Sequence, residues 1–128
     1  MKIRIRDGLP HVALVIAYRN RQIELPNVLV DTGSAGTVFS ADRMLDIGLH
    51  YEANDTVHRI RGVGGAEFVF SKQVDCLFMG ELQATNFQVE VGALDYGFDL
   101  DGIIGMDFLM QAGAVINLAK LEIGQESD

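Results

Sequence analysis

Short apolar runs separated by turn residues occupy most of the chain, and their spacing predicts β-hairpins. Residues 12–18 and 22–25 flank a polar triplet at 19–21, which is typical of a hairpin turn. Pro26-Asn27 is then expected to break the chain, because proline cannot donate to a strand ladder. The run Val28-Leu29-Val30 that follows, rich in β-branched residues, is typical of a short buried strand.

Two further hairpins are predicted. Residues 57–61 and 67–71 flank a glycine-rich tip, and residues 76–79 and 82–84 turn at Gly80-Glu81. The glycine-rich tip consists of Gly62, Val63, Gly64 and Gly65. Apolar residues at positions 87, 89 and 91 alternate with polar ones, which is the pattern of a half-buried strand.

Two short helices complete the predicted elements. Ser40 is a suitable N-cap for a helix over residues 41–47, and Gly48 can end it in the left-handed conformation. A second helix is expected over residues 106–112, ended by Gly113. Strand character is expected at residues 103–104, 114–117 and 120–123.

These elements predict a single domain spanning residues 1–128, with an all-β fold: a closed, mostly antiparallel barrel with one or two short helices. No linker or fixed-period repeat divides the chain. Residues 92–101 are the expected mobile surface loop. Asp95, Asp99 and Asp101 lack an EF-hand pattern, which favours a solvated acidic loop over a calcium site.

Charge and cysteine content narrow the function classes. The 18 acidic and 10 basic residues give a formal charge of −8, which repels phosphate backbones and argues against nucleic-acid binding. The single cysteine, Cys76, can form no intrachain disulfide. Neither a signal-peptide pattern nor a membrane-spanning run is evident, so the expected location is cytoplasmic, without membrane association.

The segment best suited to catalysis is Asp31-Thr32-Gly33-Ser34, which follows directly on the predicted buried strand. Gly33 has no Cβ, so the turn is unhindered and a second carboxylate can come close. The short hydroxyls of Thr32 and Ser34 can lock the loop and hydrogen-bond the carboxylate. The same residue types are common in ordinary tight turns, so the motif alone is a weak signal.

One carboxylate is not sufficient for acid–base hydrolysis of a peptide bond. Two must lie close enough that their repulsion leaves one protonated and one ionised, so that one activates water and the other protonates the scissile carbonyl. The chain contains a single Asp-Thr-Gly, so the second carboxylate must come from a second copy. A two-fold symmetric homodimer is therefore predicted, with the site on its axis.

Three segments, in order, resemble the retropepsin-like, or retroviral-type, aspartic protease family. VLVDTGSAGTVFS at residues 28–40 is similar to the family's catalytic loop. IRGVGGAEFV at residues 60–69 is similar to the glycine-rich flap that closes over bound peptide. DGIIGMDFLMQAGAVINL at residues 101–118 is similar to the strand beside the catalytic loop and its following helix. The resemblance covers most of the chain.

The resemblance implies an aspartic endopeptidase that uses water as nucleophile, needs no metal or organic cofactor, and acts on an extended peptide or protein. Asp31 would be the catalytic acid and base, and Thr32 would hydrogen-bond its twin in the partner subunit. Gly33 would offer its backbone to substrate, and Ser34 would hydrogen-bond the carboxylate. The flap tip would be Gly62, Val63, Gly64 and Gly65, and the subsite wall would be Ile103, Ile104 and Gly105.

Two positions depart from the viral pattern. Viral members commonly pair an Asp four residues after the catalytic one with an Arg after the late glycine, and here these positions hold Ala35 and Met106. Both charges are missing together, which avoids an unpaired buried charge but predicts a different dimer contact. The alternative function is a non-catalytic peptide-binding or dimerisation module of the same fold.

The remaining candidate residues favour structural roles. His11, His50 and His58 have no ligand-like spacing. Cys76 lies in an apolar run without an obvious histidine partner, so a buried, unreactive thiol is expected.

Overall fold

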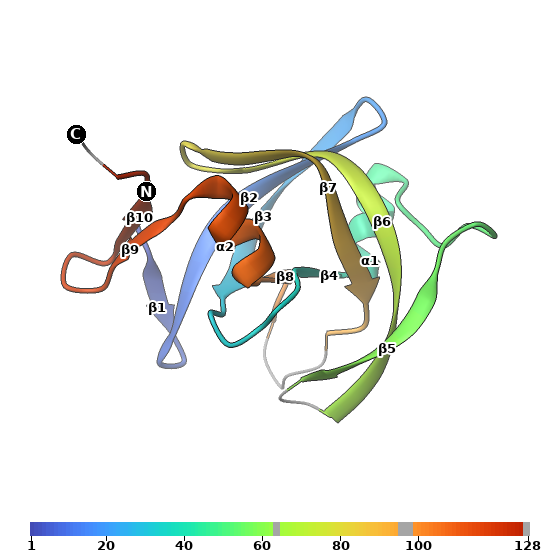
Figure 1. Cartoon of the computed structure of the whole chain (residues 1–128), viewed down its shortest axis with the longest axis horizontal. Helices are drawn as coiled ribbons and strands as arrows, with labels where there is room; N and C mark the ends of the chain where they lie inside the picture. The colour runs from blue at the N-terminus through green and yellow to red at the C-terminus, as the bar shows by residue number, and fades with distance from the viewer. Residues whose placement is uncertain (63–64, 95–98, 127–128) are drawn as a thin grey trace.

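Strands dominate the structure, a computed structural model that describes residues 1–62, 65–94 and 99–126 (Figure 1). The strands are β1 (Arg4–Arg6), β2 (Leu9–Tyr18), β3 (Arg21–Val30), β4 (Val38–Ser40), β5 (Val57–Gly62), β6 (Gly65–Met79), β7 (Leu82–Gly92), β8 (Gly102–Ile104), β9 (Val115–Asn117) and β10 (Glu122–Gly124). The helical segments are α1 (Ala41–Met44), the 3₁₀ turn η1 (Leu45–Ile47) and α2 (Met106–Ala112).

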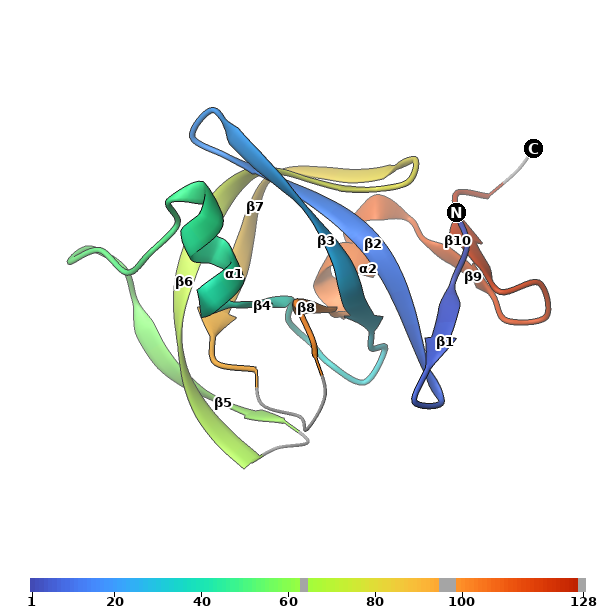
Figure 2. The same cartoon turned by 180° about the vertical axis from the view of Figure 1, so that it is seen from behind.

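The main sheet has the strand order β1-β2-β3-β8-β4-β7-β6-β5, and β2 also pairs with β6. The pairings therefore run from β2 through β3, β8, β4, β7 and β6 back to β2 (Figures 1 and 2). Among the described strands, β3–β8 and β4–β7 are parallel and the other pairs are antiparallel. The prediction of a mostly antiparallel β fold with short helices is confirmed.

Two of the predicted hairpin turns lie within the described residues, and both contain left-handed backbone. Arg19 and Asn20 join β2 to β3 with φ angles of 46° and 66°, which suit the twist of a two-residue hairpin. Gly80 has a φ of 62° between β6 and β7. Gly48 and Gly113 end the helical segments with φ angles of 72° and 67°, as expected from the sequence.

The expected break at Pro26-Asn27 does not occur, and that prediction is wrong. Strand β3 continues through both residues. Its register on β2 shifts there, because Leu25 pairs with Leu14 and Val28 pairs with Val12. Proline has no N–H to donate, so it fits a bulge of this kind, where the ladder is already interrupted.

The core fills the space enclosed by the strands and α2. Alternate residues of β2 and β7 point inward, and Phe87 meets Phe108 of α2 edge-to-face, with ring centroids 5.9 Å apart. The predicted alternation at positions 87, 89 and 91 is confirmed, since all three side chains are buried in this cluster. Cys76 is also buried, and burial raises the pKa of its thiol, as expected for an unreactive cysteine.

Asp101 is buried, so the expectation of a solvated acidic loop is wrong at this position. Its Oδ2 accepts a hydrogen bond from the Asn27 amide at 2.9 Å, and its Oδ1 lies 3.7 Å from Arg43. Its own amide donates to the Asn27 carbonyl at 2.8 Å, and its carbonyl accepts from Ser40 at 2.9 Å. Asp101 thus joins β3 and β4 where they approach β8. Asp95 lies outside the described residues.

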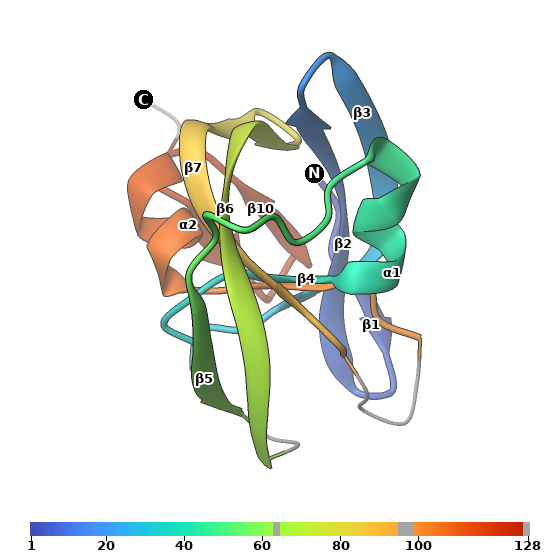
Figure 3. The same ribbon diagram turned by 90° about the vertical axis from the view of Figure 1, so that its right-hand side faces the viewer.

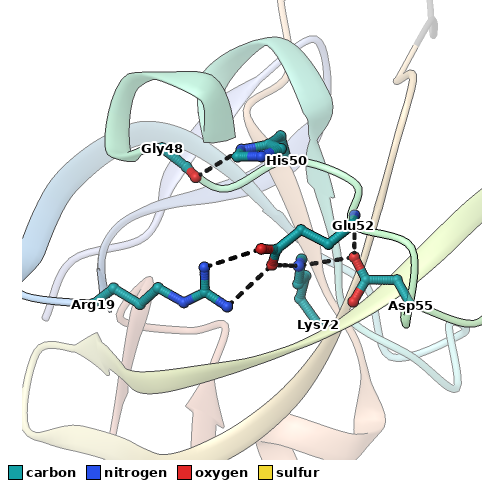
Figure 4. A network of polar contacts seen from close by, with 6 residues as sticks. All are labelled: Arg19, Gly48, His50, Glu52, Asp55 and Lys72. Atoms are coloured by element: carbon teal, nitrogen blue, oxygen red, sulfur yellow. Dashed lines mark hydrogen bonds and ion pairs between the residues drawn. The ribbon is translucent and has the colours of Figure 1, made fainter.

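A polar network anchors the segment that leads into β5 (Figure 4). The ammonium of Lys72, on β6, is buried between the carboxylates of Glu52 and Asp55, and it lies 2.8 Å from Asp55. Arg19 pairs with Glu52 at 3.0 Å. Hydrogen bonds from Lys72 and then Arg19 lower the pKa of Glu52 to about 2. The β5–β6 hairpin, which extends from the rest of the sheet in Figure 3, is therefore fixed at its base.

No described helix is long and apolar enough to cross a lipid bilayer.

Candidate active site

Asp31 lies at the point where β3 leaves the sheet. Its amide continues the ladder by donating to the Ile104 carbonyl of β8 at 2.9 Å. The preceding residues Leu29 and Val30 pair in parallel with Ile103 and Ile104. Val30 is in the core, so strand alternation places Asp31 on the opposite face, together with Leu29.

The turn after Asp31 holds its carboxylate through the backbone. The Gly33 amide donates to Asp31 Oδ1 at 2.9 Å, and the Ser34 amide donates to the Asp31 carbonyl at 3.1 Å. A Cβ at Gly33 would lie 3.2 Å from Oδ1, tighter than ordinary contact. The Ser34 hydroxyl differs from expectation, because it donates to the Gly36 carbonyl at 2.7 Å and not to the carboxylate. Ser34 therefore supports the shape of the loop.

The junction between β8 and α2 is hydrogen-bonded to this loop. The first amides of α2, from Met106 and Asp107, donate to the carbonyls of Ser34 at 2.8 Å and Ala35 at 3.2 Å. These are amides that a helix leaves without internal partners. A Cβ at Gly105 would lie 2.2 Å from the Gly36 carbonyl oxygen, so only glycine fits. The loop and the late Ile-Ile-Gly segment thus form one unit.

Thr37 and Asp107 complete this unit, and the sequence analysis missed both. Thr37 is 0% exposed. Its hydroxyl donates to Asp107 Oδ1 at 2.7 Å and accepts from the Gly105 amide at 3.1 Å. The same carboxylate oxygen accepts from the Phe108 amide at 2.7 Å. The available signals were a lone hydroxyl before the apolar residues of β4 and an acidic residue in the first turn of a helix.

The two departures from the viral pattern fall in this region. Ala35 is exposed and Met106 is half-buried. The hydrogen bonds between the loop and α2 at these positions use only backbone groups, so they do not require the missing ion pair. The viral charges are therefore dispensable for holding the loop within one chain.

The expected flap corresponds to the β5–β6 hairpin. The two strands pair antiparallel, and Gly62 faces Gly65 in the last pair before the tip. Val63 and Gly64 lie outside the described residues. The hairpin prediction is confirmed for the strands on both sides of the tip, although β6 is one continuous strand from Gly65 to Met79 where two separate ones were expected.

The residues expected to form a subsite wall take different places. Ile104 is 0% exposed and belongs to the core, whereas Ile103 is 5% exposed and lies outside that cluster, on the face of Asp31. Thr32 is exposed. The fold thus brings Asp31, Gly33, Ser34 and Gly105 together and leaves Thr32 open.

A family model described as aspartyl protease matches residues 17–108 of the chain. The matched region runs from β2 into α2, so it contains the Asp31 loop, the β5–β6 hairpin and the β8 segment. No curated protein is similar enough to the chain to count as a match.

Proposed function

The chain belongs to an aspartyl protease family of the retropepsin-like clan, and from that premise we propose that it hydrolyses peptide bonds with two Asp31 carboxylates, one from each subunit of a homodimer. The observation that carries the proposal is the Asp31 carboxylate, held by the Gly33 amide at 2.9 Å on the face opposite the core. The ring of pairings from β2 back to β2 supports the closed acid-protease barrel that the family implies.

The proposed mechanism uses the paired carboxylates as a unit. Close approach of two Asp31 side chains leaves one proton shared between them, because both cannot remain ionised. The ionised group takes a proton from water, which attacks the scissile carbonyl. The protonated group donates to the carbonyl oxygen and then assists departure of the amine. The Gly33 amide keeps the carboxylate oriented throughout.

The terminal strands are the proposed dimer contact. The N-terminal segment is tied to β10, since the Met1 amino group donates to the Ile123 carbonyl at 2.8 Å and Lys2 bridges to Glu122. Figure 1 shows β1, β9 and β10 together on one side of the molecule. Exposed apolar side chains occur on and next to these elements: Ile5 on β1, Leu9 at the start of β2, Val115 on β9, and Leu118 and Leu121 between β9 and β10. Burying these side chains against a second copy is favourable, and Thr32 is exposed, so it can contact Thr32 of that copy.

The substrate is proposed to bind as an added, extended strand between the flap hairpin and the loop. Ile103 is the supported wall residue, because it lies on the face of Asp31, while Ile104 is in the core.

The test compares purified wild-type protein with Asp31→Asn on a peptide library, alongside Asp42→Asn, an exposed aspartate of α1. Wild type and Asp42→Asn should cleave, and Asp31→Asn should lose at least about a thousandfold in kcat/KM, because no carboxylate remains to activate water. Solution mass should show a dimer. A strict monomer, or equal cleavage by Asp31→Asn, contradicts the proposal. A dimer that binds peptides without cleaving them identifies a non-catalytic module.

A further inference from the structure

A row of paired residues crosses five strands and contains a carboxylate at its fourth position. Leu29 of β3 pairs with Ile103 of β8, which pairs with Val38 of β4. Val38 pairs with Glu90 of β7, which pairs with Ser71 of β6. Residues directly opposite each other in a sheet project to the same side. All five side chains therefore lie on one face.

That face is the one that carries Asp31. Leu29 precedes Asp31 by two residues, and alternation puts both on the same side. The neighbours of the row on the other side, Val30, Phe39, Val91 and Ile104, belong to the core. Ile103 and Val38 are buried but lie outside that core cluster. The apolar part of the row thus starts two residues before Asp31 and ends at Glu90.

The Glu90 carboxylate is held through only one of its two oxygens. Its Oε2 accepts a hydrogen bond from the Ser71 hydroxyl at 2.9 Å and lies 3.1 Å from His58 Nε2 of β5. Its amide donates to the Thr37 carbonyl, directly after the Asp31 loop, at 2.9 Å. The Glu90 side chain is 16% exposed. Its Oε1 accepts no hydrogen bond from the part of the chain that the structure describes.

A half-buried carboxylate with an open oxygen favours a cationic hydrogen-bond donor, because charge-assisted hydrogen bonds are stronger than neutral ones. We infer that Glu90 is a specificity residue that binds a basic side chain, arginine or lysine, of the peptide. This inference rests on the proposed peptide hydrolysis. The formal charge of −8 on the chain also favours the approach of a basic peptide.

Strand spacing gives the position of that side chain in the peptide. Glu90 is three strand steps from Leu29, which corresponds to about 14 Å at the usual spacing between strands. An extended peptide advances about 3.3 Å per residue, so the basic residue lies roughly four residues from the scissile bond. Ile103 and Val38 lie between, which gives apolar preferences at the intervening positions.

The experiment measures kcat/KM for peptides that carry Arg, Lys, Leu or Glu at each position flanking the cleaved bond. Wild type is compared with Glu90→Gln, which keeps the size and the acceptor for Ser71 but removes the charge, and with Glu90→Lys. The matched control is Glu24→Gln, an exposed glutamate of β3. The wild type and Glu24→Gln should prefer Arg or Lys over Leu by about tenfold or more at one position. Glu90→Gln should lose that preference, and Glu90→Lys should prefer Glu.

Binding of the same peptides to Asp31→Asn protein separates this inference from the proposed function. Cleavage without a basic preference, or a preference that survives in Glu90→Gln, overturns the inference and leaves peptide hydrolysis standing; Glu90 then only anchors β5 through His58. Absence of cleavage by wild type, with basic peptides still bound at least about tenfold more tightly and only when Glu90 is present, overturns peptide hydrolysis and supports the inference.

Discussion

Thr37 and Asp107, 70 residues apart in the chain, share a hydrogen bond of 2.7 Å that ties the Asp31 loop to helix α2. The Thr37 hydroxyl also accepts from the Gly105 amide, so one buried side chain joins the loop, β8 and α2. The geometry of the loop is therefore set within one chain, before any partner subunit contributes.

Thr37→Val keeps the shape of the side chain but removes both hydrogen bonds. The Gly105 amide then loses its acceptor, and Asp107 Oδ1 loses one of its donors. This should lower the free energy of unfolding by about 1–3 kcal/mol. Urea denaturation measures this change. Thr85→Val, at an exposed position of β7, is the control and should stay within about 0.5 kcal/mol of wild type. Equal stability of the two variants would show that the contact contributes nothing.

Gly105→Ala tests the close approach of the loop to β8. The added methyl would lie 2.2 Å from the Gly36 carbonyl oxygen and 2.8 Å from that of Ser34, so the backbone has to move. Overpacking of this kind should cost about 1–3 kcal/mol or more and reduce activity, because the Asp31 turn shifts with the loop. Gly124→Ala, which meets no atom within 4 Å, is the control in thermal unfolding. A Gly105→Ala protein as stable and active as the control contradicts the close packing of the loop against Gly105.

The polar network around Lys72 predicts a dependence of stability on pH. The pKa of Glu52 falls from 4.5 to about 2 on folding, so the contribution of its carboxylate to folding stability is fully present above pH 4.5. It is lost as the pH falls from 4.5 through about 2, because the folded carboxylate is then protonated. Lys72→Met removes the cation that Glu52 and Asp55 share.

Urea midpoints between pH 7 and 2 should show wild type losing stability more steeply than Lys72→Met below pH 4.5. The difference in stability between wild type and Lys72→Met should therefore decrease as the pH falls. Lys120→Met, at an exposed lysine, should follow the wild-type curve. Parallel curves for wild type and Lys72→Met would contradict the network's role.

Asp101→Ala should destabilise the protein although Asp99→Ala should not. The first change leaves the half-buried Asn27 amide without its acceptor and removes one of the two carboxylates that pair with Arg43, at a cost of about 1–3 kcal/mol. Asp99 is exposed, so its truncation should change stability by less than about 0.5 kcal/mol. Chemical denaturation of the two variants measures the difference in the free energy of unfolding. Similar values for both would show that the contacts of Asp101 do not stabilise the protein.

Ile5→Lys tests the proposed dimer contact. Ile5 is an exposed apolar residue of β1, and a charge there opposes burial against a second copy. Sedimentation should show a shift to monomer with loss of cleavage, since a monomer has one Asp31. Leu45→Lys, at an exposed apolar residue of η1, should remain dimeric. A dimeric, active Ile5→Lys protein would place the contact elsewhere.

Local signals in the sequence account for the elements. Asn20 and Gly80 adopt the left-handed conformations that their turns need, and Ser40 caps α1 by accepting from the Arg43 amide at 3.4 Å. The expected helix over residues 106–112 agrees with α2, ended by Gly113. These features depend on contacts between residues a few positions apart, so they can be read from a short stretch of chain.

The sequence by itself determined the family, the mostly β fold and the place of Asp31 at the end of a buried strand. Only the tertiary structure decided that Asp101 is buried and binds the Asn27 amide, that Thr37 binds Asp107, and that Glu90 follows the apolar residues of the row that starts beside Asp31. The physical reason is that strand register and burial come from pairings between distant segments, and an isolated stretch carries no signal for its partner. Pro26 shows this directly, because a residue that breaks a strand locally is accommodated in a bulge of β3, where Pro26 and Asn27 lie opposite the single residue Ala13 of β2.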